Sequence, residues 1–143
     1  MAVQWGFMPP PSQALRDYAA ELYARRAEGV VAPRQVITVG AWNPQPNLCH
    51  DNALSLAERD ETYTAVHGWL YFDLGGVMPF VRFAAHSVVQ NQRNELIDIT
   101  PLAQPAALYP FIRSNLSVEE FADAVNVLVA AHGSSNCLDH WLA

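Results

Sequence analysis

The chain has 143 residues, of which 51% are hydrophobic and 15% are charged, and its formal net charge is -6. This composition is typical of one globular domain spanning residues 1–143, not of a disordered chain, and the acidic charge argues against a nucleic-acid partner. No apolar run approaches the roughly 20 residues of a membrane helix, and the start has three consecutive prolines and no basic segment. We therefore expect a soluble cytoplasmic protein with no membrane partner; export without a cleaved signal peptide stays open.

The first part of the chain predicts a helix, a short strand and a second helix. Apolar residues recur at helical spacing over residues 12–28, and Ser12 can cap this helix. A β-branched run predicts a strand over residues 35–39. An irregular, proline-containing stretch follows, and Asn47 is then a suitable N-cap for a helix that ends near Arg59 or Asp60.

The second part predicts strands and a last helix. Runs rich in aromatic and β-branched residues predict strands over residues 62–74, 79–90 and 94–99, and the short connection at 91–93 predicts a hairpin between the last two. Ser117 and Glu120 form a capping-box pattern for a helix from 118 to about 131, and the tail after 133 is ambiguous. The expected fold is α+β, an antiparallel sheet of three to five strands with the helix after Asn47 packed on it.

Cys49 lies at the start of that second helix, at about its second residue. The unpaired N–H groups of a helix N-terminus favour a thiolate over a thiol and can also bind an oxyanion. A buried structural cysteine is the alternative, as is a disulfide with Cys137, the other cysteine of the chain. Position alone therefore makes Cys49 a candidate nucleophile and no more.

His86 and Asp98 strengthen this candidate, because they are equidistant from the centre of the predicted hairpin at Gln92. With a three-residue loop and no register shift they are direct cross-strand partners, with Cβ atoms about 4.5–5.5 Å apart. An aspartate there can accept the imidazole Nδ1–H and orient the ring, which leaves the other nitrogen to take the thiol proton. A structural His–Asp pair is the alternative.

A tetrahedral intermediate also needs a neutral hydrogen-bond donor beside the backbone N–H of the nucleophile. Asn43, Gln45 and Asn47 lie in the loop before Cys49, and Asn47 is occupied if it caps the helix. Asn43 is the preferred oxyanion donor and Gln45 the second choice, with turn formation as the alternative role for each.

The order Cys, His, Asp, with the cysteine opening a helix and the other two on following strands, resembles the papain-like and transglutaminase-like thiol hydrolase superfamily. The resemblance covers roughly residues 43–101 and rests on Asn43 and the runs Asn47-Leu-Cys-His-Asp-Asn-Ala53, Ala85-His-Ser-Val-Val89 and Glu95-Leu-Ile-Asp-Ile-Thr-Pro101. It implies a related fold and supports Asn43 as the amide donor. The compact Cys-to-Asp span is most similar to the transglutaminase-like and small bacterial deamidase branches.

Three further residues are candidates for the substrate cleft. His50 follows the nucleophile and can line the cleft or serve a structural role. His67 can be a partner behind the site or a satisfied half-buried histidine. Trp69 is either core or cleft wall.

These residues predict a cysteine-dependent hydrolase or acyltransferase that forms a thioacyl intermediate through Cys49, His86 and Asp98. The substrate is then a protein, a peptide or a small amide, attacked at a peptide bond or a glutamine side chain, so protease, amidase and deamidase activities remain open. No cofactor or metal is expected. One alternative is a zinc site among Cys49, His50, His67, His86 and Asp98, and another is a non-catalytic binding module on the same fold. The oligomeric state is not indicated.

Overall fold

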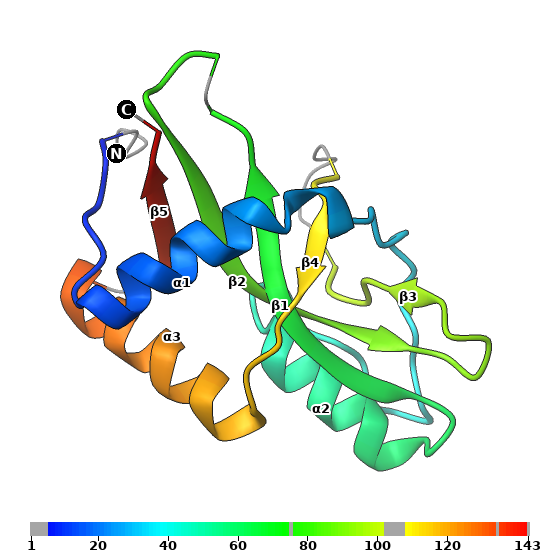
Figure 1. Cartoon of the computed structure of the whole chain (residues 1–143). Coiled ribbons are helices and arrows are strands. Elements are labelled where there is room, and N and C mark those ends of the chain that lie inside the picture. Colours follow the sequence, from blue (N-terminus) through cyan, green and yellow to red (C-terminus); the bar gives the residue numbers. More distant parts are fainter. Residues whose placement is uncertain (1–5, 75, 102–107, 134, 143) are drawn as a thin grey trace.

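A computed structural model describes residues 6–74, 76–101, 108–133 and 135–142. The expected α+β class is confirmed, because these residues form three α-helices and a five-stranded antiparallel sheet (Figure 1). No helix in these ranges is long and apolar enough to cross a membrane. The elements are α1 (Gln13–Ala24), the 3-10 turn η1 (Arg26–Glu28), α2 (Cys49–Arg59), β1 (Thr64–Phe72), β2 (Phe80–Gln90), β3 (Leu96–Ile97), β4 (Phe111–Arg113), α3 (Val118–His132) and β5 (Cys137–Trp141).

Strand β2 is the longest strand and organises the sheet. One edge of β2 pairs with β1 along most of its length, and β1 pairs with β4 on its far side. The opposite edge of β2 is shared, since β5 pairs with its start, as far as Ala84, and β3 pairs with its end, from Val89. The edge of β2 between Ala84 and Val89 therefore has no strand partner among the described residues.

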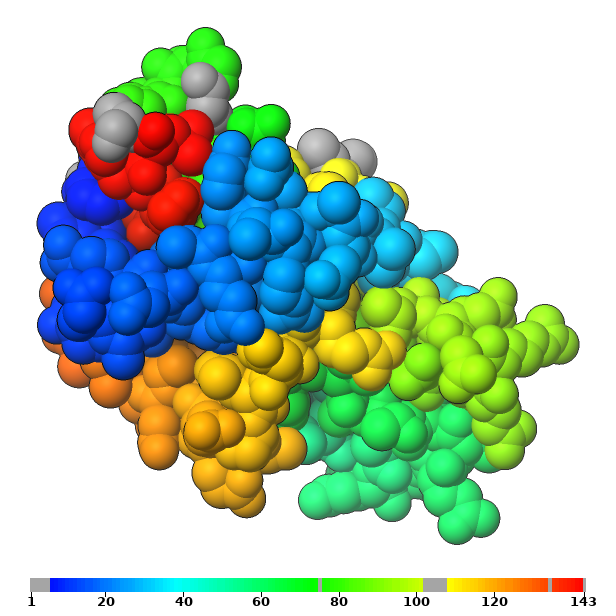
Figure 2. Space-filling view, viewed as in Figure 1, coloured from blue at the N-terminus to red at the C-terminus, as the bar shows by residue number. Residues whose placement is uncertain are grey.

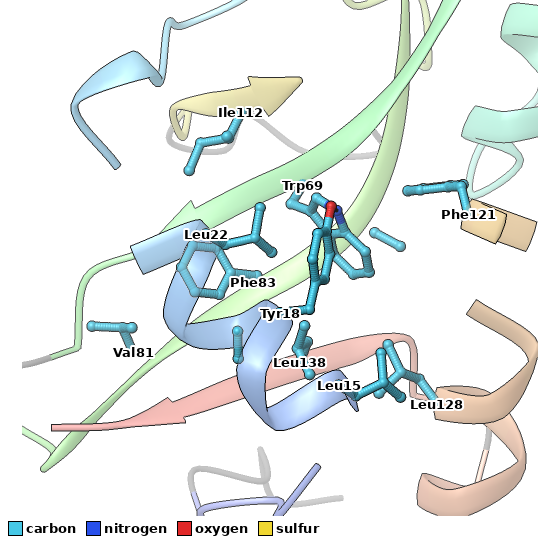
Figure 3. Close-up of a cluster of buried hydrophobic side chains, with 12 residues drawn as sticks. Leu15, Tyr18, Leu22, Trp69, Val81, Phe83, Ile112, Phe121, Leu128 and Leu138 are labelled. Carbon is cyan, nitrogen blue, oxygen red and sulfur yellow. Dashed lines mark hydrogen bonds between the residues drawn. The ribbon is translucent and has the colours of Figure 1, made fainter. Parts of the chain in front are cut away.

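All three helices pack on one face of this sheet. The odd-numbered residues of β1 and β2 point to this face, because successive side chains of a strand alternate. Helices α1 and α3 cover one half of it around Trp69, as Figure 3 shows, and α2 covers the other half around Val89. The main core comprises Leu15, Tyr18, Ala19, Leu22, Trp69, Val81, Phe83, Ala85, Ile112, Phe121, Leu128 and Leu138.

The opposite face of the sheet carries a smaller core in which Ala32, Val66, Val88 and Phe111 are buried together. Gly68 of β1 makes this packing possible. A Cβ on Gly68 would stand 2.6 Å from the Phe111 ring and 2.3 Å from a backbone oxygen, so only glycine admits this close approach. His86, the direct partner of Gly68 on β2, lies on the same face.

Several predicted elements are confirmed. Ser12 caps α1 through the backbone N–H of Leu15, and the helix gives way to the 3-10 turn after Ala24. Ser117 and Glu120 form the predicted capping box of α3. Helix α2 ends at Arg59 as expected.

Other predicted elements are wrong or incomplete. Residues 35–39 form no strand; the segment makes only isolated bridges, between Arg34 and Asp98 and between Val39 and Trp42. The third predicted strand is reduced to the two residues of β3. Strand β4 lies between the last predicted strand and the last predicted helix, where no element was predicted, and β5 lies in the ambiguous tail. Their pairing depends on partners distant in sequence, which local patterns do not reveal.

The hairpin between β2 and β3 is confirmed, but its register differs from the prediction. The observed pairs are Val89 with Ile97 and Gln90 with Leu96. The turn lies one residue later than predicted, because the N–H of Asn91 donates to the carbonyl of Glu95 and Asn94 adopts a left-handed conformation with φ 63°. His86 and Asp98 are therefore offset by two residues and are diagonal neighbours, not direct partners.

Candidate active site

Cys49 is the first residue of α2, one position earlier than expected. Leu48 is the N-cap and its side chain provides no acceptor, while Asn47 takes a left-handed conformation with φ 64°. The prediction that Asn47 caps the helix is thus wrong. No side chain therefore caps the first N–H groups of α2. These groups carry partial positive charge, and they lie at the helix start beside the sulfur of Cys49.

The start of α2 lies against the open edge of β2. The sulfur of Cys49 interacts with the ring of His86, and Nδ1 of His50 lies 2.5 Å from Oγ of Ser87. His86 and Ser87 are consecutive in the strand, so their side chains point to opposite faces of the sheet. Consecutive residues of α2 reach both faces because this helix start lies at the edge of β2 near Ser87, next to Ala85, whose backbone binds Asn136.

Asp98 holds the ring of His86. Its Oδ2 lies 2.7 Å from Nε2 of His86, and the two side chains are 6% and 12% exposed. The prediction that the two residues meet is confirmed, but the expected ring nitrogen is wrong. The carboxylate takes Nε2–H, and Nδ1 is the nitrogen left for the sulfur of Cys49. His86 and Asp98 are diagonal neighbours because the register is offset by two residues. In this arrangement Nε2 of the His86 ring faces the carboxylate.

Sequence reasoning missed Arg34 as a second partner of Asp98. Nη2 of Arg34 donates to Oδ2 of Asp98 at 2.9 Å, and the N–H of Thr100 donates to Oδ1 at 3.1 Å. The backbone of Asp98 is also clamped, because its N–H donates to Pro33 and its carbonyl accepts from Gln35. Every polar group of Asp98 is therefore engaged, which fixes the carboxylate in place.

The charges of the site favour an ion pair between Cys49 and His86. Burial alone would raise the pKa of Cys49, but interactions with the His50 and His86 rings outweigh burial and lower this pKa to about 6. Burial alone would lower the pKa of His86, but its interactions with Asp98 and Cys49 raise this pKa to about 9. Burial also opposes ionisation of Asp98, yet His86 and Arg34 hold its pKa below the ordinary value. Between about pH 6 and 9 the site thus holds thiolate, imidazolium and carboxylate together.

Asn52 positions the loop before Cys49, a role that the sequence did not indicate. It is buried, with 3% of its surface exposed. Its Oδ1 accepts from the N–H of Gln45, and its Nδ2 donates to the carbonyl of Gln45 and to Oγ1 of Thr100. Asn52 therefore connects the loop, helix α2 and the segment that follows Asp98. A polar residue on the same helix face as Ala53 and Leu56 was the one available signal.

The two predicted oxyanion donors are engaged within their own loop. Nδ2 of Asn43 donates to the carbonyl of Ala41 at 3.5 Å, and Nε2 of Gln45 donates to the carbonyl of Asn43 at 3.2 Å. Both residues are exposed. These contacts are the turn interactions that were the alternative role, and the oxyanion role of Asn43 and Gln45 stays a prediction.

His50 and His67 meet at Ser87, on the helix-covered face. Oγ of Ser87 lies 2.5 Å from Nδ1 of His50 and 2.6 Å from Nδ1 of His67. A hydroxyl carries one proton, so Ser87 can donate to only one of the two rings, and at least one ring donates its Nδ1–H to Ser87 or leaves that contact without a proton. His67 also stacks on Phe121, with ring centroids 5.1 Å apart. Both histidines, with Phe121, line a groove between α2 and α3.

Trp69 belongs to the core and not to a cleft wall. It is fully buried, and its Nε1–H donates to Oη of Tyr18 at 3.1 Å, so its one polar group is satisfied inside the protein. The cleft role that we considered for Trp69 is therefore wrong.

The two cysteines are free thiols with opposite tendencies. Burial raises the pKa of Cys137, despite a hydrogen bond with Ser135, whereas the pKa of Cys49 is lowered. The disulfide alternative is thus wrong for this structure.

The zinc alternative drew its possible ligands from Cys49, His50, His67, His86 and Asp98. In the described part of the chain, no group of three or more His, Cys, Asp or Glu residues is arranged to hold a metal ion. The candidates are divided by the sheet: His50 and His67 bind Ser87 on one face, while His86 and Asp98 meet on the other.

The chain matches no protein-family model, no curated protein and no solved structure.

Proposed function

We propose that the protein is a cysteine-dependent hydrolase or acyltransferase of the papain-like or transglutaminase-like kind, acting on an amide of a protein, a peptide or a small molecule. The observation that carries the proposal is the chain of contacts from the thiol of Cys49 through His86 to Asp98. A half-buried thiol with a lowered pKa, beside an imidazole that a carboxylate orients, is the arrangement that nucleophilic catalysis needs.

In the acylation step, the thiolate of Cys49 attacks the carbonyl carbon, a C–S bond forms, and the carbonyl oxygen takes the displaced electron pair. The backbone N–H groups at the uncapped start of α2 can stabilise this oxyanion. The imidazolium of His86 then gives its Nδ1 proton to the leaving nitrogen as the C–N bond breaks. Asp98, which accepts Nε2–H, keeps the ring in place throughout.

In the second step, neutral His86 takes a proton from water or from an acceptor amine, which attacks the thioacyl carbon. The C–S bond breaks, and the sulfur leaves as the thiolate that the imidazolium stabilises. Hydrolysis of a peptide bond, deamidation of a glutamine side chain and acyl transfer share these steps. They differ in the leaving nitrogen and in the acceptor.

The chain offers an internal control for this proposal, because Cys137 is a second free thiol with a raised pKa. Iodoacetamide at neutral pH should alkylate Cys49 much faster than Cys137, as mass spectrometry of the modified peptides would show. Cys49→Ala should abolish the fast phase, and Cys137→Ala should leave it unchanged. Equal rates at the two cysteines would count against an activated Cys49.

A further inference from the structure

An apolar groove of about 220 Å³ lies between α2 and α3, and His50, the residue after the candidate nucleophile, lines it. In the space-filling view the surface is notched between the start of α3 and α2 (Figure 2). Two of the apolar residues that form it are well exposed, Leu54 at 44% and Val118 at 59%. The lining comprises His50, Leu54, His67, Val118, Phe121, Ala122, Val125 and Asn126.

The Nδ1 atoms of the two histidines that line this groove are engaged inside the protein. Nδ1 of His50 and Nδ1 of His67 both face Oγ of Ser87, which is 1% exposed. His67 also stacks on Phe121, and burial lowers the pKa of His67, which keeps its ring neutral near pH 7. No Asp, Glu, Lys or Arg lines the groove. An uncharged, apolar group is therefore the chemistry that fits it.

The groove ends at the residue that follows the candidate nucleophile and lies away from the proton donor. His50 lines the groove, follows Cys49 in the chain and interacts with its sulfur. His86 reaches the sulfur from the opposite face of the sheet. There the centroid of its ring lies 6.4 Å from the centroid of the Phe111 ring. The leaving nitrogen must approach His86 to receive a proton, so the part of the substrate that stays on the sulfur is directed to the His50 side.

We propose that the groove between α2 and α3 binds an uncharged aliphatic side chain or acyl chain on the acyl side of the substrate that Cys49 attacks. This inference rests on the proposed function. The volume of about 220 Å³ is below the roughly 300–1,000 Å³ of pockets that enclose a whole small ligand. The groove thus accommodates one side chain and selects substrates by it, while the rest of the substrate lies outside.

The test compares iodoacetamide with N-butyl iodoacetamide, each rate being divided by the rate of the same reagent with free glutathione. If the butyl group enters the groove, the corrected rate at Cys49 should be about tenfold higher for the butyl reagent, a modest gain for an apolar pocket. Ala122→Trp fills the groove from an exposed position of α3, and Ala122→Glu places a charge there. Both variants should reduce the ratio to about one.

Ala130→Trp is the matched control, since Ala130 is exposed on the same helix and does not line the groove. It should keep the tenfold ratio. Equal corrected rates in the unmodified protein, or a preference that survives both Ala122 variants, would overturn the inference while leaving Cys49 as nucleophile. A Cys49 that reacts with iodoacetamide no faster than Cys137 would instead overturn the proposed function, and the inference with it.

Discussion

Nε2 of His86 and Oδ2 of Asp98 lie 2.7 Å apart although the two residues are not cross-strand partners. They meet diagonally across the end of the hairpin, on the face opposite the helices. Asp98 fixes the position of this pair, because its carboxylate also accepts hydrogen bonds from Arg34 and from the N–H of Thr100. The orientation of His86, and with it the charge on Cys49, therefore depends on a carboxylate that the fold has fixed.

Asp98→Asn should remove the charge that favours the imidazolium while keeping a hydrogen-bond acceptor. The pKa of His86 should fall back toward its ordinary value of 6.5, and the pKa of Cys49 should rise. The pH profile of iodoacetamide labelling should shift upward by about one unit, which slows labelling below that pKa about tenfold. Asp51→Asn, an equal change of charge at an exposed residue of α2, should shift the profile little and in the opposite direction. An unchanged profile in Asp98→Asn would contradict the role of Asp98.

The pH dependence of alkylation at Cys49 should differ from the pH dependence of turnover, because the two reactions need different protonation states of the site. Alkylation needs only the thiolate, so its rate should fall as pH drops through about 6 and stay high on the alkaline side. Hydrolysis of an amide also needs protonated His86 as the acid, so turnover should fall again as pH rises through about 9. Stopped-flow alkylation and steady-state turnover over the same pH range provide the comparison. A turnover profile with no alkaline limb would exclude His86 as the acid for the leaving nitrogen.

Arg34→Gln should reveal how the second cation affects the site. Arg34 is a positive charge near protonated His86, so its removal should raise the pKa of His86 and move the alkaline limb of turnover upward. The side chain of Arg34 is 24% exposed, so solvent screens part of the effect and the shift should stay below about one unit. Arg93→Gln, at the exposed hairpin turn, is the control. A downward shift in Arg34→Gln would contradict this reasoning.

Asn52→Ala should destabilise the protein and loosen the loop before Cys49. It leaves the N–H and carbonyl of Gln45 and the hydroxyl of Thr100 without their present partner. We expect a loss of about 2–3 kcal/mol in the free energy of unfolding, measured with urea. Asn43→Ala, at an exposed position of the same loop, should cost less than about 0.5 kcal/mol, as surface substitutions do. If Asn43→Ala also leaves turnover unchanged, Asn43 is not an oxyanion donor.

The parity of the hairpin explains why the site could be predicted from an incorrect register. Moving the turn by one residue changes every cross-strand partner by two, and a shift of two returns each side chain to the same face. His86 and Asp98 therefore stayed on one face. A loop one residue longer or shorter would have separated them.

The missed residues share a different cause. Arg34 and Asn52 matter through partners that are 64 and 48 positions away in the sequence, and no local pattern marks such contacts. Strand β5 is fixed in the same way, because Asp139 forms a buried ion pair with Arg82 of β2 at 2.7 Å. Capping boxes and strand periodicity were predictable because they are local. Residues 35–39 were predicted as a strand from composition alone, although an isolated bridge from Val39 to Trp42 is the one local pairing they make in the described chain.

Besides carrying Cys49, helix α2 covers part of an edge of β2. A strand edge without a neighbour is a template for pairing with another molecule, and soluble proteins need to cover it. The edge of β2 between Ala84 and Val89 has no strand partner in the described parts of the chain, and the turn that carries Cys49 lies there. Loss of this docking should lower the reactivity of Cys49 and at the same time expose the edge of β2 at Ser87. Variants that weaken the contact of α2 with Ser87 should therefore both slow the alkylation of Cys49 and promote aggregation.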